Sequence, residues 1–328
     1  LYPGADDRDP EACPQLECST PCLDPLNIWT WSAVRRRTTG GEYDAWIMPY
    51  WTWAWAGLEW YLLRASQRPP VVAVVHNPVD HDAGAMQRLA ARVVLRRCQA
   101  LFTHAEVLAS LLRDVYPAVP VAAHPLPSPD NVPLPDGRFA RSELGLDATA
   151  RVALFMGLIR SYKGVDLLVE AFARLRDTPW RLVVAGEPWG RLGEALKRQV
   201  RRLGLEDVVR LDLRWLSEDE IRVRLAAADA VVLPYRTGSQ SAVAPLAMSH
   251  GVPVVSSRVG GLAEDVEHGV NGLLVEPDSV EELIEALARL DRRQLDQLAD
   301  GARATSRGLD WDGYARAMER LVERVVRS

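Results

Sequence analysis

Short apolar runs alternate with helical patterns through the second half of the chain, and this alternation restricts the fold more than any other feature. The runs hold four to six residues, and between them apolar residues recur every three or four positions. Strands that alternate with helices form a parallel, doubly wound sheet with right-handed connections. The expected strands are residues 152–156, 181–185, 208–213, 230–233, 252–256 and 272–275.

Segment 234–264, PYRTGSQSAVAPLAMSHGVPVVSSRVGGLAE, contains a first candidate site. It is typical of a strand end, a polar turn, a helix over 242–249 that starts near 239–241, a strand, and a Gly-Gly turn. A helix amino end carries unpaired N–H groups and partial positive charge, which suit phosphate, and parallel sheets bind ligands at this carboxyl edge. The alternative is an ordinary strand–helix–strand unit with a polar loop.

A second candidate site is the turn 157–164, GLIRSYKG, which follows the first strand of this half. Arg160 can hold phosphate oxygens with two donors, and Lys163 adds a point charge. The alternative is a solvated basic turn. Both candidate sites belong to the same carboxyl edge, so together they could bind the two phosphates of a diphosphate.

The first half is less regular, but three of its expected strands end in or next to a histidine: His76, His104 and His124. His76 is the best candidate for function, because a polar cluster, residues 76–82, begins there. A structural histidine is the alternative. Residues 125–137 are rich in proline and typical of a linker, so we place the domain boundary there.

Composition excludes several classes of protein. A chain of 328 residues is long enough for two domains, and 48% hydrophobic with 25% charged residues is normal for a soluble globular protein. The net charge of −5 and scattered arginines argue against nucleic-acid binding. We see no apolar run of membrane-spanning length and no signal peptide, and we expect a cytoplasmic protein.

Cysteines and tryptophans leave two questions open. Cys13, Cys18 and Cys22 could bind a metal, but no fourth ligand follows at zinc-like spacing, so ordinary thiols are favoured. Seven of the eleven tryptophans lie between Trp29 and Trp60. They indicate core and interdomain packing or, alternatively, a surface for sugar or lipid, with peripheral contact to the inner membrane surface through region 46–60.

The second half resembles the donor domain of retaining, family 4 glycosyltransferases of the GT-B fold (glycosyl transferases group 1). The resemblance rests on FMGLIRSYKGVDLLVEAF, LVVAGEP, AAADAVVLP, SHGVPVV and VGGLAEDVEHGVNGLLVEPDS, in the family's order. AVVHN, ALFTH and AHP in the first half, and LDWDGYA near the end, match more loosely. The resemblance implies an α/β protein with two Rossmann-like domains facing across a cleft. Its expected parts are an acceptor-side domain (1–136), a donor domain (137–306) and a helix crossing back to the first domain (307–328).

The resemblance also implies transfer of a sugar from a nucleoside diphosphate to a glycan or lipid-linked acceptor, with retained configuration. No cofactor or metal is expected, and a UDP-sugar is the expected donor by family frequency. Arg160 and Lys163 would stabilise the departing diphosphate, and His76 would lie near the reacting sugar. The expected donor-binding residues are Gly157, Ser239, Gln240, Ser241, Ala242 and Glu264.

The chain departs from the family in three places. The family's pair of glutamates, eight positions apart, is replaced by Gly238 and Leu246, and the arginine that usually follows Gly157 is Leu158. Nothing before Tyr43 matches the family's first βαβ unit, which predicts a chain that lacks its amino-terminal start. A non-catalytic nucleotide-sugar-binding relic or fragment is therefore the main alternative function, and a GT-B sugar epimerase is a second.

Overall fold

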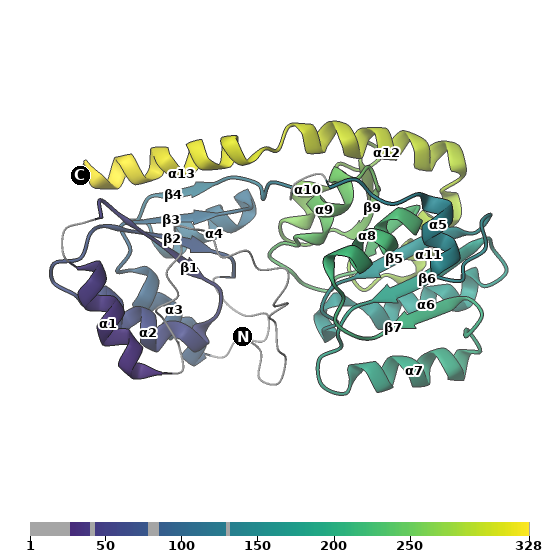
Figure 1. Ribbon diagram of the computed structural model, residues 1–328, viewed down its shortest axis with the longest axis horizontal. Coiled ribbons are helices and arrows are strands. Elements are labelled where there is room, and N and C mark those ends of the chain that lie inside the picture. The colour runs from purple at the N-terminus through teal and green to yellow at the C-terminus, as the bar shows by residue number, and fades with distance from the viewer. Residues whose placement is uncertain (1–26, 40–42, 78–84, 129–131, 328) are drawn as a thin grey trace.

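The computed structural model describes residues 27–39, 43–77, 85–128 and 132–327, so the candidate metal ligands Cys13, Cys18 and Cys22 lie outside the described residues. Two sheets organise the described part of the chain (Figure 1), one with strand order β1-β2-β3-β4 and one with order β10-β9-β8-β5-β6-β7. Their neighbouring strands run parallel. Helices connect successive strands, as the alternating pattern of the second half predicts.

The strands are β1 (Trp46–Tyr50), β2 (Val71–Val75), β3 (Ala100–Thr103), β4 (Val121–Ala123), β5 (Arg151–Met156), β6 (Trp180–Ala185), β7 (Val209–Asp212), β8 (Ala230–Leu233), β9 (Val254–Ser257) and β10 (Gly272–Val275). The α-helices are α1 (Ile28–Thr38), α2 (Ala56–Leu63), α3 (Ala85–Leu95), α4 (Glu106–Val115), α5 (Gly137–Glu143), α6 (Val165–Leu175), α7 (Leu192–Leu203), α8 (Glu218–Ala227), α9 (Val243–Ser249), α10 (Leu262–Asp265), α11 (Val280–Arg289), α12 (Arg292–Arg307) and α13 (Trp311–Val326). Two short 3₁₀ helices are η1 (Trp53–Trp55) and η2 (Ser161–Lys163).

Both faces of the first sheet are covered, which explains why all five residues of β2 are buried. Successive side chains of a strand point to opposite faces. Val71, Ala73 and Val75 pack with buried residues of α3 and α4, whereas Val72 and Val74 pack with α13.

The last helix connects the two halves of the molecule. Figure 1 shows α12 beside the second sheet and α13 running on along the first sheet, so the chain crosses back after 307. Met318, Leu321 and Val325 lie at helical spacing on α13 and contribute its buried face. Burial of this face fixes the last helix against β2 and β3.

One helix begins later than its sequence pattern predicts. Helix α9 starts at Val243 with Ala242 as its N-cap, rather than near 239–241. The reason is tertiary, because the amide of Gly261 donates to the carbonyl of Ser239 at 2.7 Å and holds that residue in the loop. The polar turn is therefore longer, and the helix shorter, than the sequence indicates.

Candidate active site

The carboxyl ends of the two sheets meet at a set of contacts that we call the domain seam: residues 76–77 and 104–107 of the first half against 238–241 and 260–264 of the second. The Ser239 hydroxyl donates a hydrogen bond to the side-chain oxygen of Asn77. A methyl group placed on Gly261 would lie 2.9 Å from the Ala105 side chain, so the backbones approach closely here. The seam therefore brings Ser239 and Glu264, two predicted donor-binding residues, into contact with the first half.

Glu264 makes the most extensive polar contact across the seam. Its carboxylate accepts hydrogen bonds from the backbone amides of Glu106 at 2.7 Å and Val107 at 2.5 Å. These amides begin α4, where a negative charge is favoured by the helix dipole. The predicted donor-binding residue Glu264 thus bridges the second half to the first in this structure.

Lys163 lies at the carboxyl edge of the second sheet. Its ammonium group lies 5.3 Å from the ring centre of Tyr235, two residues after the end of β8. A methyl group added to Gly157 would sit 3.5 Å from this ammonium nitrogen and 3.7 Å from the Val243 side chain. Gly157, Lys163 and the start of α9 are therefore close neighbours, as the two candidate sites together predict.

Arg160 has a different neighbour from Lys163. Its guanidinium carbon lies 4.2 Å from the ring centre of Trp189, which follows β6 and is 41% exposed. This distance is typical of a cation–π contact. The two cations of the turn 157–164 are thus directed toward different strand ends, and a diphosphate role for Arg160 stays a prediction.

An arginine that the sequence did not single out fixes the turn around Lys163. Arg236 donates two hydrogen bonds to the Asp166 carboxylate, at 2.8 and 2.7 Å, and a third to Asp278 at 2.8 Å. It also donates to the carbonyl of Ser161 at 2.8 Å. Paired arginine–carboxylate contacts of this kind define orientation as well as distance. The sequence does not reveal this role of Arg236, because its partners lie far from it along the chain.

The buried side chain of Tyr235 anchors the polar loop before α9. Tyr235 is buried, its hydroxyl lies 3.4 Å from that of Ser241, and burial raises the pKa of the phenol to about 12. The Ser241 hydroxyl accepts from the amide of Val243 at 3.2 Å. Gln240 is partly buried and Ala242 is exposed in the same loop. Ser239 to Ala242 thus form one stretch that links the seam to the start of α9.

Aromatic and imidazole rings line the carboxyl edge of the first sheet. The ring centre of His76 lies 4.9 Å from that of Trp51 and 4.9 Å from that of His104. Burial lowers the pKa of both His76 and His104 to about 4, so both imidazoles are neutral at neutral pH. The role of His76 near the reacting sugar remains a prediction, but its position at the seam is compatible with it.

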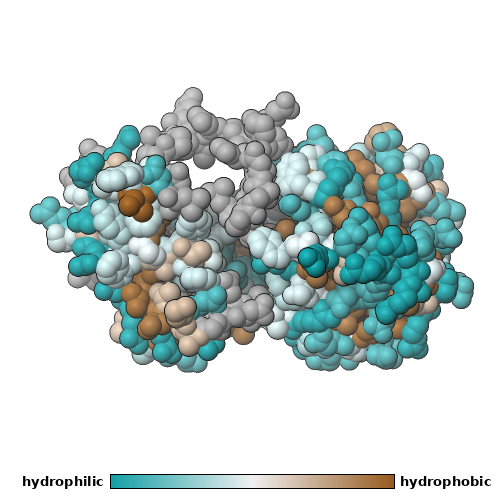
Figure 2. Space-filling model, turned by 90° about the horizontal axis from the view of Figure 1, so that it is seen from below, coloured by the Kyte–Doolittle hydropathy of each residue, from teal (hydrophilic) through white to brown (hydrophobic). Residues whose placement is uncertain are grey.

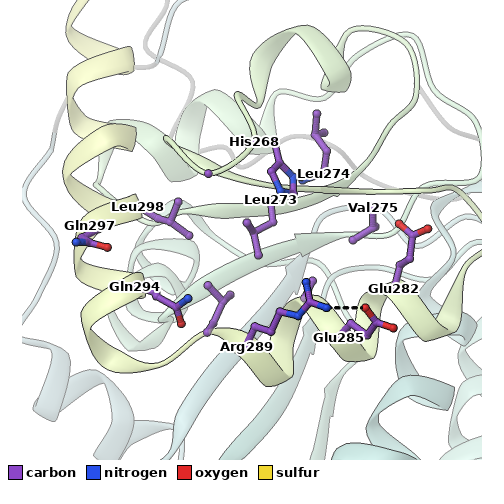
Figure 3. Close-up of a pocket in the computed structure, with 13 residues that line it drawn as sticks. His268, Leu273, Leu274, Val275, Glu282, Glu285, Arg289, Gln294, Gln297 and Leu298 are labelled. Atoms are coloured by element: carbon purple, nitrogen blue, oxygen red, sulfur yellow. Dashed lines mark hydrogen bonds and ion pairs between the residues drawn. The ribbon is translucent and has the colours of Figure 1, made fainter.

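A cavity of about 610 Å³ lies elsewhere, between β10, α11 and α12 (Figure 3). Its lining includes His268, Leu298 and an ion pair between Arg289 and Glu285, with nitrogen and oxygen 3.1 Å apart. None of the predicted site residues contributes to this cavity. Within the described ranges, no group of three or more His, Cys, Asp or Glu side chains is arranged to bind a metal ion.

Two parallel-sheet domains meet at their carboxyl edges, with a lysine beside a glycine turn on one edge and histidines on the other, and this arrangement fits the predicted class of protein, the GT-B glycosyltransferases. The family model "Glycosyl transferases group 1" matches residues 150–292. The chain is 33% identical over 300 residues to a D-inositol 3-phosphate glycosyltransferase of Actinosynnema mirum, covering 83% of this chain and 70% of the relative. It is 32% identical over 307 residues to D-inositol 3-phosphate glycosyltransferase 1 of Catenulispora acidiphila, covering 86% and 72%.

Solved structures give the same fold. Sucrose-phosphate synthase from Thermosynechococcus elongatus superimposes with a TM-score of 0.78 at 22% identity, covering 90% of this chain and 77% of the other. Anabaena HepE in complex with UDP has a TM-score of 0.74 at 21% identity, covering 94% and 85%. The chain belongs to the glycosyl transferases group 1 family. It is a glycosyltransferase that uses nucleotide sugars, and the predicted GT-B fold is confirmed.

We expect the substitution Glu264→Ala to loosen the seam. It removes a carboxylate that accepts from two α4 amides, and because Glu264 is exposed we expect a loss near the lower end of about 1.5–3 kcal/mol. Hydrogen exchange at the Glu106 and Val107 amides should accelerate. Glu267→Ala, at an exposed glutamate three residues on, is the matched control. Unchanged protection in Glu264→Ala would show that the carboxylate does not hold the two halves together.

Proposed function

We propose that the donor of this glycosyltransferase is a UDP-sugar whose diphosphate lies against Lys163, Gly157 and the loop from Ser239 to Ala242. The observation that carries this proposal is the Lys163 ammonium group, 3.5 Å from a methyl position on Gly157 and next to the start of α9. HepE, a neighbour in fold, is solved with UDP and with UDP-glucose. A uridine nucleotide is therefore the first donor to test.

The proposed chemistry relies on fixed charge. As the bond between the sugar and the diphosphate breaks, negative charge grows on the phosphate oxygens, and an ammonium group already in position lowers the barrier without reorganising. Arg236 supports this arrangement, because it holds both ends of the segment that carries Lys163 through Ser161 and Asp166. Arg160 would add a second cation if it leaves Trp189.

His76 would act from the other side of the seam, near the reacting sugar. A neutral imidazole has one N–H donor and one acceptor nitrogen, so it can orient a sugar hydroxyl without adding charge. The sugar would pass with retained configuration to a hydroxyl group of a glycan or a lipid-linked acceptor. The relatives described above are named for D-inositol 3-phosphate, a phosphorylated polyol, which makes that compound a useful acceptor probe.

The missing glutamate pair changes how the donor would be held. Leu246 packs against the hydrophobic core, so it offers no hydrogen bond to a ribose or a sugar. A methyl group on Gly238 would meet the Tyr235 ring at 3.4 Å, an ordinary contact. We propose that hydroxyl and amide groups of Ser239, Gln240 and Ser241 replace the carboxylates.

We also propose that the protein works in the cytoplasm and contacts the inner membrane surface through region 46–60. Four large side chains there are 36% to 56% exposed: Ile47, Trp51, Trp53 and Trp60. Arg64 lies over the Trp60 ring at 4.5 Å, which pairs an interfacial aromatic with a cation. In Figure 2, hydrophobic residues, coloured brown, are seen at the surface of both halves of the molecule. No helix in the described ranges is long and apolar enough to cross a membrane.

Lys163→Ala should weaken UDP binding about ten- to hundredfold, because one charge-assisted contact is lost. Isothermal titration with UDP, GDP and ADP measures this loss and identifies the base. Lys197→Ala is the control, since Lys197 is an exposed lysine on α7 that pairs with Glu194 at 2.9 Å. Equal UDP affinity in wild type and Lys163→Ala would remove the proposed phosphate site. Binding without any turnover would favour the non-catalytic alternative.

Replacement of Trp51 and Trp53 by serine should abolish flotation of the protein with vesicles of phosphatidylglycerol and phosphatidylcholine. Wild type should float with these vesicles and lose the interaction at high salt, because part of the attraction is electrostatic. Trp215→Ser, at a tryptophan of the second half that is 49% exposed, is the matched control. A wild-type protein that stays at the bottom of the gradient would contradict membrane contact.

A further inference from the structure

His104 is a buried histidine that the proposed function leaves unused. It follows β3, is 4% exposed, and neither of its ring nitrogens has a hydrogen-bond partner within the described residues. Buried polar groups in folded proteins are nearly always paired, so an unpaired one requires an explanation. In a neutral imidazole both the N–H donor and the acceptor nitrogen are then unused.

The position of His104 places it beside the predicted catalytic histidine. Strands β2 and β3 are parallel neighbours, with Val74 paired to Phe102, so His76 and His104 follow them at the same edge of the sheet. Their ring centres are 4.9 Å apart, with planes inclined by 47°. On its other side, His104 stacks on Tyr314 of α13 with ring centres 5.7 Å apart and planes 17° apart.

These contacts fix the His104 ring without using its nitrogens. The ring centre of Phe102 lies 6.1 Å from that of His104, edge to face. The ring centre of His124 lies 5.8 Å from that of Tyr314. Burial is the main cause that lowers the pKa of His104 to about 4; the charges of His76 and His124 also lower it and a backbone contact with His124 raises it, so the ring is neutral at neutral pH. A neutral, oriented imidazole suits a neutral ligand that both donates and accepts, which is what a hydroxyl group does.

We propose that His104 is an acceptor-binding residue that holds a hydroxyl group of a sugar or polyol acceptor next to the hydroxyl group that His76 faces. This proposal rests on the proposed function, in which His76 lies near the reacting sugar, because the acceptor hydroxyl group must reach that same sugar. His76 would then face the donor sugar, and His104, with its ring centre 4.9 Å away at the same sheet edge, would hold the acceptor hydroxyl group. The acceptor would be selected by how well a hydroxyl group fits beside His104, and α13 would contribute to that selection through Tyr314.

The test is the substitution His104→Phe, which keeps a planar ring against Tyr314 and removes both nitrogens. UDP-glucose is the donor, and D-inositol 3-phosphate, myo-inositol and methyl α-D-glucoside are the acceptor probes. We expect the KM for the acceptor probe that wild type uses to rise about ten- to hundredfold, with an unchanged UDP dissociation constant. The matched control is His124→Phe, which changes an imidazole on the next strand end that also contacts Tyr314. A KM for His104→Phe equal to that of wild type would overturn the proposal.

A thermal-shift series with UDP and each acceptor probe gives an answer that does not depend on turnover, because a ligand that binds the native state raises its apparent stability. A probe that raises the melting temperature of wild type but not of His104→Phe supports the proposal. Probes that stabilise both proteins equally, or neither, overturn it. Failure of the proposed function is recognised separately, since wild type would then neither bind UDP nor release it from UDP-glucose. Without added probe, His104→Phe should melt at or above the wild-type temperature, because an unpaired buried group has been removed.

Discussion

The contact of the Glu264 carboxylate with the first amides of α4 is the interaction on which the rest of this structure depends. The catalytic groups that we assign come from two sheets with separate hydrophobic cores, so their relative position is set by the seam together with α13, which crosses from the second half to the first sheet. Two further contacts act with it: the Ser239 hydroxyl on Asn77, and the close approach of Gly261 to Ala105. Because one of the partners is a predicted donor-binding residue, we expect donor binding and the geometry of the seam to be coupled: a donor that competes for Glu264 would release α4.

Within the second half, rigidity comes from Arg236. By joining Asp166 of α6, the Ser161 carbonyl of η2 and Asp278 of the turn before α11, it links three segments at the carboxyl edge into one unit around Lys163. An electrostatic catalyst needs this kind of support, since a charge contributes most when it does not have to move during the reaction. In the first half, contacts between rings provide the rigidity. The rings of Trp51, His76, His104 and Tyr314 form a continuous series of edge and stacking contacts. The two edges therefore offer different chemistry, fixed positive charge on one side and neutral hydrogen-bonding rings on the other.

Local signals predicted much of the second half and little of the seam. Short apolar runs such as 230–233 predicted strands, because every residue of a strand is buried when helices cover both faces of a parallel sheet. The sequence pattern of a capping box recurs at the starts of α8 and α11, but only Ser217 and Glu220 of α8 form the box. At α11 the Glu282 carboxylate accepts from the amide of Glu276, so the box with Ser279 is incomplete. The start of α9 and the unpaired burial of His104 were beyond prediction, because the first depends on Gly261 and the second on Tyr314 near the end of the chain. Local pattern identifies elements, whereas the partners of their polar ends are decided by the fold.

The most direct measurement of the central claim, that groups from both edges act on one donor, is a kinetic comparison of wild type with His76→Ala. The rate of UDP release from UDP-glucose and the dissociation constant of UDP are measured for both proteins, with His124→Ala as the control. The account predicts that kcat falls by about a hundredfold or more in His76→Ala, as expected when a group beside the reacting sugar is removed, while the UDP dissociation constant stays the same. An unchanged kcat, or a loss of UDP affinity as large as the loss of rate, would contradict it and place His76 outside the reaction.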